Sequence, residues 1–372
     1  MGSHRDIVVI GGGIVGCATV YNLALQKQDV VLLERTRPGF EASGRNTGTL
    51  NPLVHNLQDL SYRMAAYAIW RTLSDELDYD LELEMSGSVR VAETAAEFDR
   101  LKSQVSDLKA GGCRVEVLDA HSLRDFAPYI VKSAAGALYS PDGWQVNPRE
   151  VCFAYMAAAA RLGASWEQAE VVAIVRNGGG YDVVTRTGRI SAARVVLAAG
   201  PWSVDLARAL GVELPIFPRY FQALVTARVA PFLHHIITRV ANMITIKQNR
   251  NGNCVIGGGW MGDSAFPDHG RIRIDQMQEN LKIAVSLVPE LARVPLLRSW
   301  AGYDGTGPDS MPIIAEAPAW PGVFISTGAR AGFSCGPIWG ELTCDMMLGR
   351  RMRWDRTLFT LDRFEPARRQ AS

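Results

Sequence analysis

The chain has 372 residues, with 39 Lys and Arg and 38 Asp and Glu, which gives a formal net charge of +1. This balance produces no overall field that would attract nucleic acid or an anionic membrane. With 48% hydrophobic and 21% charged residues, the composition is that of a folded protein rather than a disordered one, and the length suits about two domains.

Cysteine and histidine give no sign of a metal centre. The six cysteines are scattered, no pair is spaced C-x-x-C, and the six histidines do not cluster with them. We therefore expect no protein-ligated metal and no iron–sulfur cluster within this chain. The scattered cysteines favour a reducing compartment, so we expect the protein to be cytoplasmic.

The start of the chain contains a long uncharged stretch. Residues 7–25 carry no charge, which is long enough for a membrane helix, but four glycines interrupt the first half. No basic region precedes an apolar core and a small-residue cleavage site, so we expect neither a signal peptide nor a transmembrane segment. The pattern predicts a strand over residues 5–10, a glycine loop, a helix over residues 14–26 and a strand over residues 29–33. Such a βαβ unit implies a parallel sheet.

Beyond residue 40 the pattern is mixed. Helical periodicity alternates with short apolar runs, and no repeat or low-complexity segment marks a linker, so we expect domains that are interleaved in sequence. The predicted helices are residues 57–77, 95–110, 148–162, 276–288 and 337–348. The predicted strands are residues 81–92, 137–139, 171–175, 181–186, 194–197, 223–227, 243–248, 254–257 and 323–327, with a hairpin turn at residues 177–180.

The glycine loop after the first strand has the spacing Gly11-x-Gly13-x-x-Gly16, and an acidic residue, Glu34, closes the next strand. In this context the spacing is typical of a dinucleotide-binding loop, because the glycines allow a tight turn, close approach to a pyrophosphate and helix–strand packing. The start of the helix would supply N–H groups to the phosphates, and Glu34 would bind a ribose. The alternative is a glycine-rich turn in another kind of α/β protein.

Two later strands lead into small-residue turns that would return the chain to the same nucleotide. The first turn is Ala199-Gly200-Pro-Trp202, and the second begins at Gly328. With these turns, the chain resembles the D-amino acid oxidase superfamily of FAD-dependent amine and amino acid oxidoreductases over nearly its whole length. Other segments that carry the resemblance are residues 142–149, 256–259, 308–314, 336–341 and 363–364.

The resemblance implies an α/β fold in which a Rossmann-like FAD-binding domain of the glutathione-reductase type is interleaved with a mixed-sheet substrate domain. The FAD-binding domain would comprise residues 5–80, 142–214 and 299–366, and the substrate domain residues 81–141 and 215–298. FAD would be non-covalent, because the cysteine that links flavin in monomeric sarcosine oxidase has no counterpart here. The residues that the resemblance assigns to FAD are Gly11, Gly12, Gly13, Ile14, Val15, Gly16, Glu34, Arg35, Ser43, Gly44, Arg45, Asn46, Thr47, Gly48, Thr49, Val171, Ala199, Gly200, Trp202, Gly328, Arg330, Gly332, Phe333 and Ser334.

The resemblance also implies a substrate beside the flavin. Arg330 matches an arginine that helps to hold the substrate carboxylate in glycine oxidase; the alternative is a structural or surface arginine. Asp304 stands where family members that act on simple amino acids usually carry a second arginine. This carboxylate would face a cationic substrate group such as a guanidinium, or it is a structural aspartate. Further candidates for the substrate wall are Tyr220, Tyr303, Arg219, Gln222, Trp260 and Met261.

Three functions are compatible with these features. The first is oxidation of the C–N bond of a secondary-amine amino acid, either an opine such as octopine or nopaline or D-hydroxyproline, by hydride transfer to flavin N5. Here the chain resembles the FAD-binding β subunits of heteromeric dehydrogenases such as opine oxidase, whose partner subunits carry an iron–sulfur cluster and sometimes FMN. The second is a self-contained oxidase of the glycine, D-amino acid or sarcosine type that makes hydrogen peroxide. The third is a non-catalytic flavin-binding scaffold.

Overall fold

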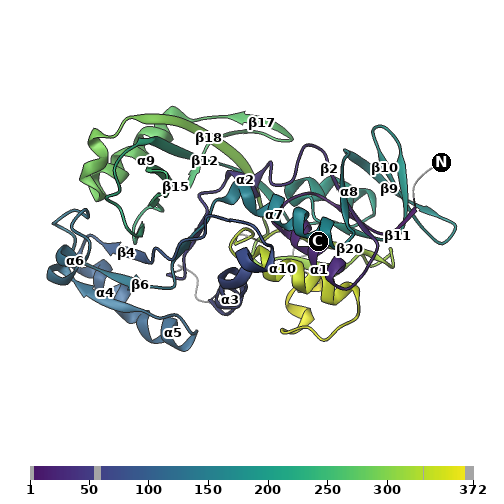
Figure 1. Ribbon diagram of the computed structural model, residues 1–372, viewed down its shortest axis with the longest axis horizontal. Coiled ribbons are helices and arrows are strands. Elements are labelled where there is room, and N and C mark those ends of the chain that lie inside the picture. The colour runs from purple at the N-terminus through teal and green to yellow at the C-terminus, as the bar shows by residue number, and fades with distance from the viewer. Residues whose placement is uncertain (1–3, 54–59, 330, 365–372) are drawn as a thin grey trace, which may run out of the picture.

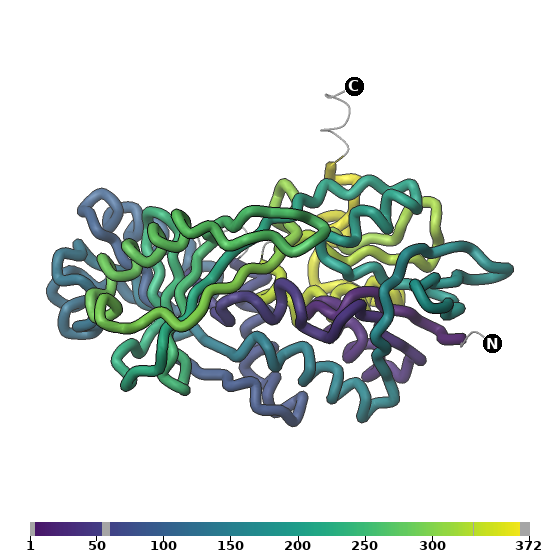
Figure 2. Tube along the Cα trace, turned by 90° about the horizontal axis from the view of Figure 1, so that it is seen from above, coloured from purple at the N-terminus to yellow at the C-terminus, as the bar shows by residue number. Residues whose placement is uncertain are grey.

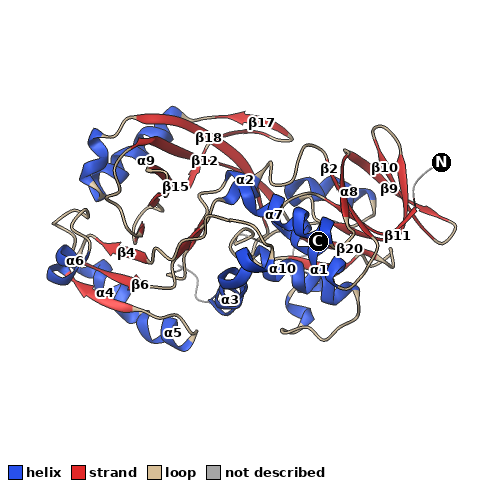
Figure 3. Cartoon of the chain, in the orientation of Figure 1, coloured by secondary structure: helices blue, strands red, loops and turns tan. Residues whose placement is uncertain are grey.

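The computed structural model describes residues 4–53, 60–329 and 331–364, and two eight-stranded sheets organise it. The sheets lie toward opposite ends of an elongated molecule, with helices between them (Figure 1). The elongated outline persists when the molecule is seen from above (Figure 2). Strands and helices are interspersed throughout, which confirms the predicted α/β class (Figure 3).

The first sheet has the strand order β19-β20-β11-β1-β2-β8, and the pairs from β20 to β8 are parallel. Its strands are almost continuously apolar because both faces are covered. Along β1, Ile7 and Val9 enter one core, whereas Val8 and Ile10 enter the core on the other face. The strands are β1 (His4–Ile10), β2 (Val30–Glu34), β8 (Ser165–Gln168), β11 (Arg189–Leu197), β19 (Ile313–Glu316) and β20 (Val323–Thr327), with the antiparallel hairpin β9 (Val171–Asn177) and β10 (Gly180–Thr185) joined to β11.

Helices cover one face of the first sheet, and the hairpin β9–β10 with α8 covers the other. The small residues of α1 allow close contact with α10: a Cβ added at Gly340 would lie 2.4 Å from the Cβ of Ala18. The helices concerned are α1 (Ile14–Leu25), α3 (Leu60–Glu76), α7 (Pro148–Arg161), α8 (Ser203–Ala209) and α10 (Gly336–Met347).

The second sheet has the order β18-β12-β15-β14-β13-β4-β6-β5 and is antiparallel except for the β13–β4 pair. One face packs on α9, through Ile283 and Leu287. The strands are β4 (Ser88–Ala92), β5 (Glu116–Asp119), β6 (Gly136–Ser140), β12 (Phe217–Arg228), β13 (Ile236–Arg239), β14 (Thr245–Gln248), β15 (Asn253–Met261) and β18 (Leu296–Thr306). The helices are α4 (Ala95–Ser103), α5 (Val105–Ala110), α6 (Ala120–Phe126) and α9 (Ile274–Leu287).

Short elements join the two sheets. β3 (Thr49–Leu50) pairs with β7 (Trp144–Gln145), and α2 (Ala42–Arg45) lies beside β18. A hairpin formed by β16 (Asp263–Ala265) and β17 (Asp268–Arg271) projects from the second sheet toward the first (Figure 1). Within the described ranges, no helix is both long and apolar enough to cross a membrane.

Two predicted elements of the middle region differ from the structure. The predicted helix over residues 95–110 is divided at Gln104 into α4 and α5. Of the predicted strand over residues 81–92, only β4 forms, because Glu82 and Gly87 have φ values of 52° and 67° and turn the chain.

β18 was not predicted from the sequence. Its Gly302, Asp304 and Gly305 have low strand propensity, but the strand pairs with β12 along almost its whole length. Tertiary pairing therefore overrides local preference at this position. The predicted domain boundary at residues 298 and 299 falls inside β18, which belongs to the second sheet from end to end.

Replacement of Gly340 by alanine is expected to lower the free energy of unfolding by about 1–3 kcal/mol, since the new methyl group would overpack the contact with α1. Its Cβ would lie 2.4 Å from the Cβ and 2.8 Å from the carbonyl carbon of Ala18. Urea unfolding followed by circular dichroism measures the change. Gly188→Ala is the matched control, because nothing lies within 4 Å of the added Cβ there. Equal losses in the two variants would contradict this explanation.

Candidate active site

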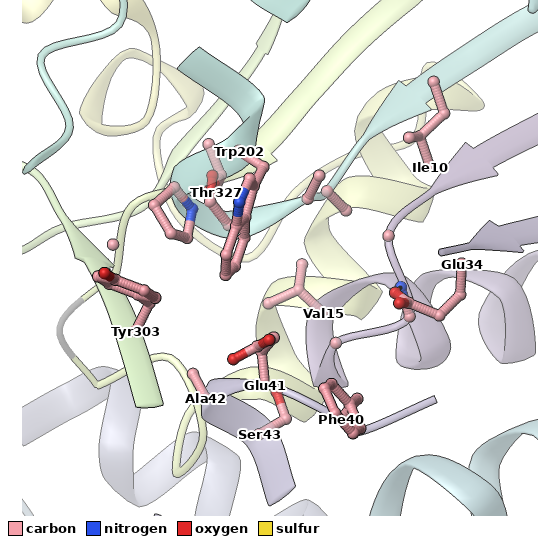
Figure 4. Close-up of a pocket in the computed structure, with 18 of the residues that line it drawn as sticks. Ile10, Val15, Glu34, Phe40, Glu41, Ala42, Ser43, Trp202, Tyr303 and Thr327 are labelled. Atoms are coloured by element: carbon pink, nitrogen blue, oxygen red, sulfur yellow. Dashed lines mark hydrogen bonds between the residues drawn. The ribbon is translucent and has the colours of Figure 1, made fainter. Parts of the chain in front are cut away.

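A cavity of about 720 Å³, called here the first cavity, lies where the carboxyl ends of β1, β2, β11 and β20 face the second sheet. In α/β sheets, this carboxyl edge is where ligands bind. The opposite wall comes from β18 and the β16–β17 hairpin. Figure 4 shows Trp202, Tyr303 and Glu41 projecting toward the same space from three different segments.

The glycine loop after β1 brings backbone, without side chains, to the edge of this cavity. Gly11 has a φ of +107°, and a Cβ there would lie 2.5 Å from the carbonyl oxygen of Ala198. A Cβ at Gly16 would lie 2.0 Å from the oxygen of Gly11, so α1 can begin directly against the loop. Around Gly13, in contrast, the nearest atom is the Oγ of Ser43 at 3.4 Å. The loop therefore leaves open space at the positive end of α1, where an anion is favoured.

Glu34 is held at the rim of the first cavity by hydrogen bonds to both carboxylate oxygens. Oε2 accepts from the N–H of Gly12 at 2.8 Å, and Oε1 accepts from the N–H and the hydroxyl of Thr36 at 2.9 Å each. The next residue, Arg35, places its guanidinium carbon 4.0 Å from the ring centroid of Trp202. These contacts hold a carboxylate and a cation in place on the cavity wall.

Residues 42–48, most of which the resemblance assigns to FAD, contain the short helix α2, and their side chains bind this loop to its surroundings. The hydroxyl of Ser43 accepts from the N–H of Ile14 at 2.9 Å, at the start of α1. Asn46 donates to the oxygen of Ser43 at 2.8 Å, and its Oδ1 accepts from the N–H of Gly48 at 2.7 Å. The loop is thus a folded element rather than an open, solvated one.

Arg45 connects this loop to the second sheet. Its guanidinium donates to the carbonyl oxygens of Phe40 and Ala301, both at 2.8 Å. In return, the indole N–H of Trp300 donates to the carbonyl oxygen of Arg45 at 2.7 Å. A side chain at Gly302 would collide with Arg45, because a Cβ there would lie 2.7 Å from Cδ of the arginine. The main contacts of Arg45 are therefore structural.

The C-terminal turn lines the cavity over part of its length. Gly328, with a φ of +90°, Gly332 and Phe333 are in the lining. Ser334 contacts α3 instead, since its carbonyl oxygen accepts from the indole N–H of Trp70 at 2.8 Å. Arg330, the predicted carboxylate ligand, lies outside the described residues.

An aromatic cluster lies behind the predicted substrate wall. Tyr303 lines the cavity and contacts the rings of Tyr220, Trp202 and Phe266 at centroid distances of 4.5, 5.8 and 5.2 Å. Its hydroxyl accepts from the N–H of Ala265 at 2.8 Å and donates to the oxygen of Asp268 at 2.9 Å. Tyr303 therefore holds the β16–β17 hairpin over the cavity.

Most of the predicted site residues converge on the first cavity. Those in its lining are Gly11, Gly12, Gly13, Ile14, Val15, Glu34, Arg35, Ser43, Arg45, Asn46, Val171, Ala199, Gly200, Trp202, Tyr303, Asp304, Gly328, Gly332 and Phe333. Those outside its lining are Gly16, Gly44, Thr47, Gly48, Thr49, Tyr220, Ser334, Arg219, Gln222, Trp260 and Met261. Among the latter, Tyr220 is buried behind Tyr303, and Gln222 uses its amide to bind the backbone of Arg273 at 3.0 and 3.1 Å.

Several residues of the lining were not found from the sequence. Glu41 is bound by Arg35 at 3.3 Å, and His269 of the hairpin lies 3.8 Å from the same carboxylate. Asp268 is in the lining as well. No local pattern marks these residues, because Glu41 immediately precedes α2 and Asp268 and His269 belong to the hairpin, and both segments reach the cavity only through their tertiary positions. Other lining residues of this kind are Phe40, Ala42, Glu170, Arg186, Phe221 and Pro267.

A second cavity of about 430 Å³ lies on the other side of α2. Phe40, Arg45 and Asn46 line both cavities, so a thin wall separates them. Gly44 and Thr47 are also in the lining of the second cavity. Its charged lining residues are Arg37, Arg45, Arg149, Lys247, Arg250, Arg298, Glu82 and Glu84, with cations in the majority.

The residues of the first cavity fit an FAD molecule. The open space at Gly13 and α1 suits a diphosphate, and Glu34 is positioned for a ribose. The indole Nε1 of Trp202 is buried and has no hydrogen-bond partner among the described residues, although the ring lines the cavity. A ligand acceptor would satisfy this nitrogen. No group of three or more His, Cys, Asp or Glu side chains within the described ranges could hold a metal ion.

Comparison of the sequence with known proteins identifies a family and several relatives. The family model DAO, described as FAD dependent oxidoreductase, matches residues 6–346. Glycine oxidase of Geobacillus kaustophilus is 26% identical over 374 residues, which cover 97% of this chain and 98% of the relative. The β subunit of sarcosine oxidase from Rhizobium meliloti is 27% identical over 97% of this chain and 89% of the relative.

Solved structures share the whole fold. The crystal structure of glycine oxidase from Geobacillus kaustophilus has a TM-score of 0.90 at 25% identity and covers 96% of this chain and 98% of that chain. L-proline dehydrogenase from P. horikoshii also has a TM-score of 0.90, at 22% identity, over 99% of both chains. At that identity, the second match speaks for the fold alone.

Tyr303→Phe is expected to release the β16–β17 hairpin, because Ala265 and Asp268 lose their shared hydroxyl partner. Hydrogen–deuterium exchange of residues 263–271 should become about tenfold faster, which corresponds to the loss of about 1.4 kcal/mol from one hydrogen-bonded unit. Tyr220→Phe is the matched control, since its hydroxyl makes one long bond, 3.4 Å, to Gly270. Unchanged exchange in Tyr303→Phe would remove the assigned anchoring role.

Proposed function

The chain belongs to the DAO family of FAD-dependent oxidoreductases, and on this premise we propose that it oxidises the C–N bond of a secondary-amine amino acid. The proposed substrate is an opine such as octopine or nopaline, or D-hydroxyproline, and the chain would act as the catalytic subunit of a heteromeric dehydrogenase. The observation that carries this proposal is the set of carboxylates on the substrate side of the first cavity. It consists of Glu41, Asp268 and Asp304.

These carboxylates favour a substrate with a cationic group in addition to its amine. Asp304 lies on β18 beside Tyr303, and its Oδ2 accepts from the hydroxyl of Thr306 at 3.5 Å. The buried Oε2 of Glu41 makes no hydrogen bond among the described residues but lies 3.7 Å from Nε of Arg45, and Oε1 is bound by Arg35 at 3.3 Å, so a substrate cation would share this carboxylate with two arginines. A guanidinium binds carboxylates through two parallel hydrogen bonds, so octopine matches this wall better than glycine does. Arg330 is proposed to hold the substrate carboxylate.

The remaining lining residues are proposed to bind and orient FAD without a covalent bond. The loop Gly11–Gly13 and the start of α1 would hold the diphosphate. Glu34 would bind a ribose, and Val171 would contact the adenine. The indole N–H of Trp202 would donate a hydrogen bond to FAD. The bound flavin would supply the redox chemistry by accepting a hydride from the carbon next to the substrate nitrogen. The chain's own part is to orient that carbon: Tyr303 and the hairpin close the wall and exclude water.

Heteromeric assembly is supported by a relative and by the second cavity. A β subunit of sarcosine oxidase covers 97% of this chain. The second cavity has a volume typical of small-molecule sites, is rich in cations and shares a wall with the first. We propose that FMN and an iron–sulfur cluster are held with or by partner subunits and take electrons onward. All six cysteines are buried and none of them forms a disulfide bond, and on this basis we propose a cytoplasmic complex.

A self-contained oxidase is the second candidate function. It is favoured by the likeness to glycine oxidase, which covers 98% of that relative. Such an enzyme would act on glycine, a D-amino acid or sarcosine and produce hydrogen peroxide. A non-catalytic scaffold is a weaker candidate, because a scaffold needs no substrate wall, whereas Tyr303 and Asp304 line the first cavity.

Anaerobic mixing with candidate amines tests the proposed function. The purified chain with FAD should lose its flavin absorbance within seconds to minutes when octopine, nopaline or D-hydroxyproline is added. L-Proline, sarcosine, glycine and D-alanine are compared at equal concentration. Little peroxide should form when air is admitted, since electrons are expected to leave through a partner.

The other outcomes are equally informative. Bleaching by glycine or D-alanine with rapid peroxide formation would establish the self-contained oxidase. Flavin that no amine reduces would favour the scaffold and contradict the dehydrogenase.

Asp304→Asn tests the cation-binding role, because it removes the charge with little change in shape. The apparent dissociation constant for octopine, measured by flavin bleaching, should rise about tenfold or more, as expected for a hydrogen bond to a charged group. D-Hydroxyproline, which has no guanidinium, should be much less affected. Asp99→Asn on α4, 72% exposed, is the control. Unchanged discrimination between the two substrates would assign Asp304 a structural role.

A further inference from the structure

Lys247 is a buried cation that the FAD site described above does not use. It lies on β14 in the second sheet and is only 3% exposed. Its Nζ donates to the carbonyl oxygens of Gly48 and Val146, both at 3.3 Å. Within the described residues, no carboxylate lies at ion-pair distance from Nζ. Burying an ammonium group whose only partners are carbonyl oxygens has an unfavourable free energy, which suggests that this lysine has a function.

A continuous set of hydrogen bonds runs from Lys247 to the FAD-binding loop. Gly48 accepts from Lys247 through its oxygen and donates from its N–H to Oδ1 of Asn46 at 2.7 Å. Asn46 in turn donates to the oxygen of Ser43 at 2.8 Å. The hydroxyl of Ser43 accepts from the N–H of Ile14 at 2.9 Å, at the first turn of α1. The lysine is thus connected to the place proposed for the diphosphate.

Gly48 is closely packed against Val146 and Lys247. Gly48 has a φ of +67°, and a Cβ there would lie 2.2 Å from the oxygen of Val146 and 3.1 Å from Nζ of Lys247. The N–H of Val146 also donates to the oxygen of Gly48 at 2.9 Å. A change in the charge of Lys247 therefore acts on a closely packed piece of backbone.

The surroundings leave Lys247 able to gain or lose a proton near neutral pH. Burial lowers its pKa to about 7, and the carboxylates of Glu84 and Glu82 oppose this effect. Both carboxylates are engaged elsewhere, Glu84 with Gln145 at 2.6 Å and Glu82 with Asn147 at 2.9 Å. The other charged groups that face the same cavity are Arg37, Arg45, Arg149, Arg250 and Arg298.

We propose that Lys247 is a positioning residue for FAD, whose ammonium holds the Ser43–Gly48 loop against α1 and which takes up a proton when FAD binds. The inference rests on the FAD site of the proposed function. The diphosphate is anionic, so its binding beside the Ser43–Gly48 loop favours the charged form of the poorly solvated lysine that is hydrogen-bonded to that loop. Above pH 7, binding of FAD and protonation of Lys247 then support each other.

The test is calorimetric titration of FAD into the full chain, stripped of FAD, in buffers with different enthalpies of ionisation. At pH 8, Lys247 is mostly neutral before binding, so the unaltered chain should take up as much as about one additional proton per FAD. At pH 6, it is already charged in both states, and this uptake should vanish. The affinity for FAD should consequently fall as the pH rises from 7 to 9.

Two variants isolate the contribution of Lys247. Lys247→Met removes the charge and both donors, whereas Lys247→Gln is neutral but keeps an N–H donor for the loop, which safeguards folding. Both should lose the proton uptake at pH 8, and their affinity for FAD should become flatter with pH; in Lys247→Met it should also be about tenfold weaker at pH 6. Lys282→Met on α9, with a side chain that is 74% exposed, is the control and should behave like the unaltered chain.

The outcomes separate this inference from the proposed function. Equal proton uptake in the unaltered chain and in Lys247→Gln would overturn the role of Lys247 while leaving the FAD site intact. An unaltered chain that does not bind FAD would overturn the proposed site itself, and this inference with it.

Discussion

The architecture of the site depends on one steric constraint, which is that the backbone at the end of β1 touches two other backbone segments. A side chain at Gly11 would overlap the carbonyl group of Ala198, and one at Gly16 would overlap Gly11. Because neither side chain exists, β1, β11 and the first turn of α1 can meet within van der Waals distance. The first cavity opens at this junction, and the positive end of α1 faces it.

The second requirement is that two sheets built from interleaved segments keep their relative position. Two hydrogen bonds hold the sheets together here: Arg45 donates to the carbonyl oxygen of Ala301, and Trp300 donates to the carbonyl oxygen of Arg45. Both join residues more than two hundred positions apart in the sequence. α2 therefore connects the two sheets. It joins the sheet that carries the proposed nucleotide site to the sheet that carries the proposed substrate wall.

The sequence predicted the parts of the fold that local patterns encode. The βαβ unit from His4 to Glu34 formed as expected, because alternating burial on two faces produces a continuous apolar strand. The glycine loop and Glu34 came together at the cavity for the same local reason. β18 was not predicted, because Gly302 and Gly305 have low strand propensity. The strand is stabilised by its pairing with β12, which the local sequence does not encode.

The same distinction applies to the site. Tyr303 and Asp304 were found because the surrounding motif resembles a known family, although their strand was not recognised. Asp268, Glu41 and Lys247 could not be identified from the sequence. Asp268 lies on a hairpin, Glu41 in a turn and Lys247 on a buried strand, and the contacts of these residues form only when segments distant in sequence come together. The short helix α2 was not predicted, because its small and polar residues are typical of an open loop.

The substrate wall has a consequence for how this protein can change over evolutionary time. The residues proposed to face the substrate come from β18, from a nine-residue stretch around the β16–β17 hairpin and, for Glu41, from the position before α2. The proposed nucleotide loops follow β1, β2, β11 and β20. Mutations can accumulate in the hairpin without disturbing the backbone contacts at Gly11. If the proposed assignments hold, substrate selectivity and FAD binding depend on separate stretches of the gene, so substrate preference can change while the FAD site is preserved.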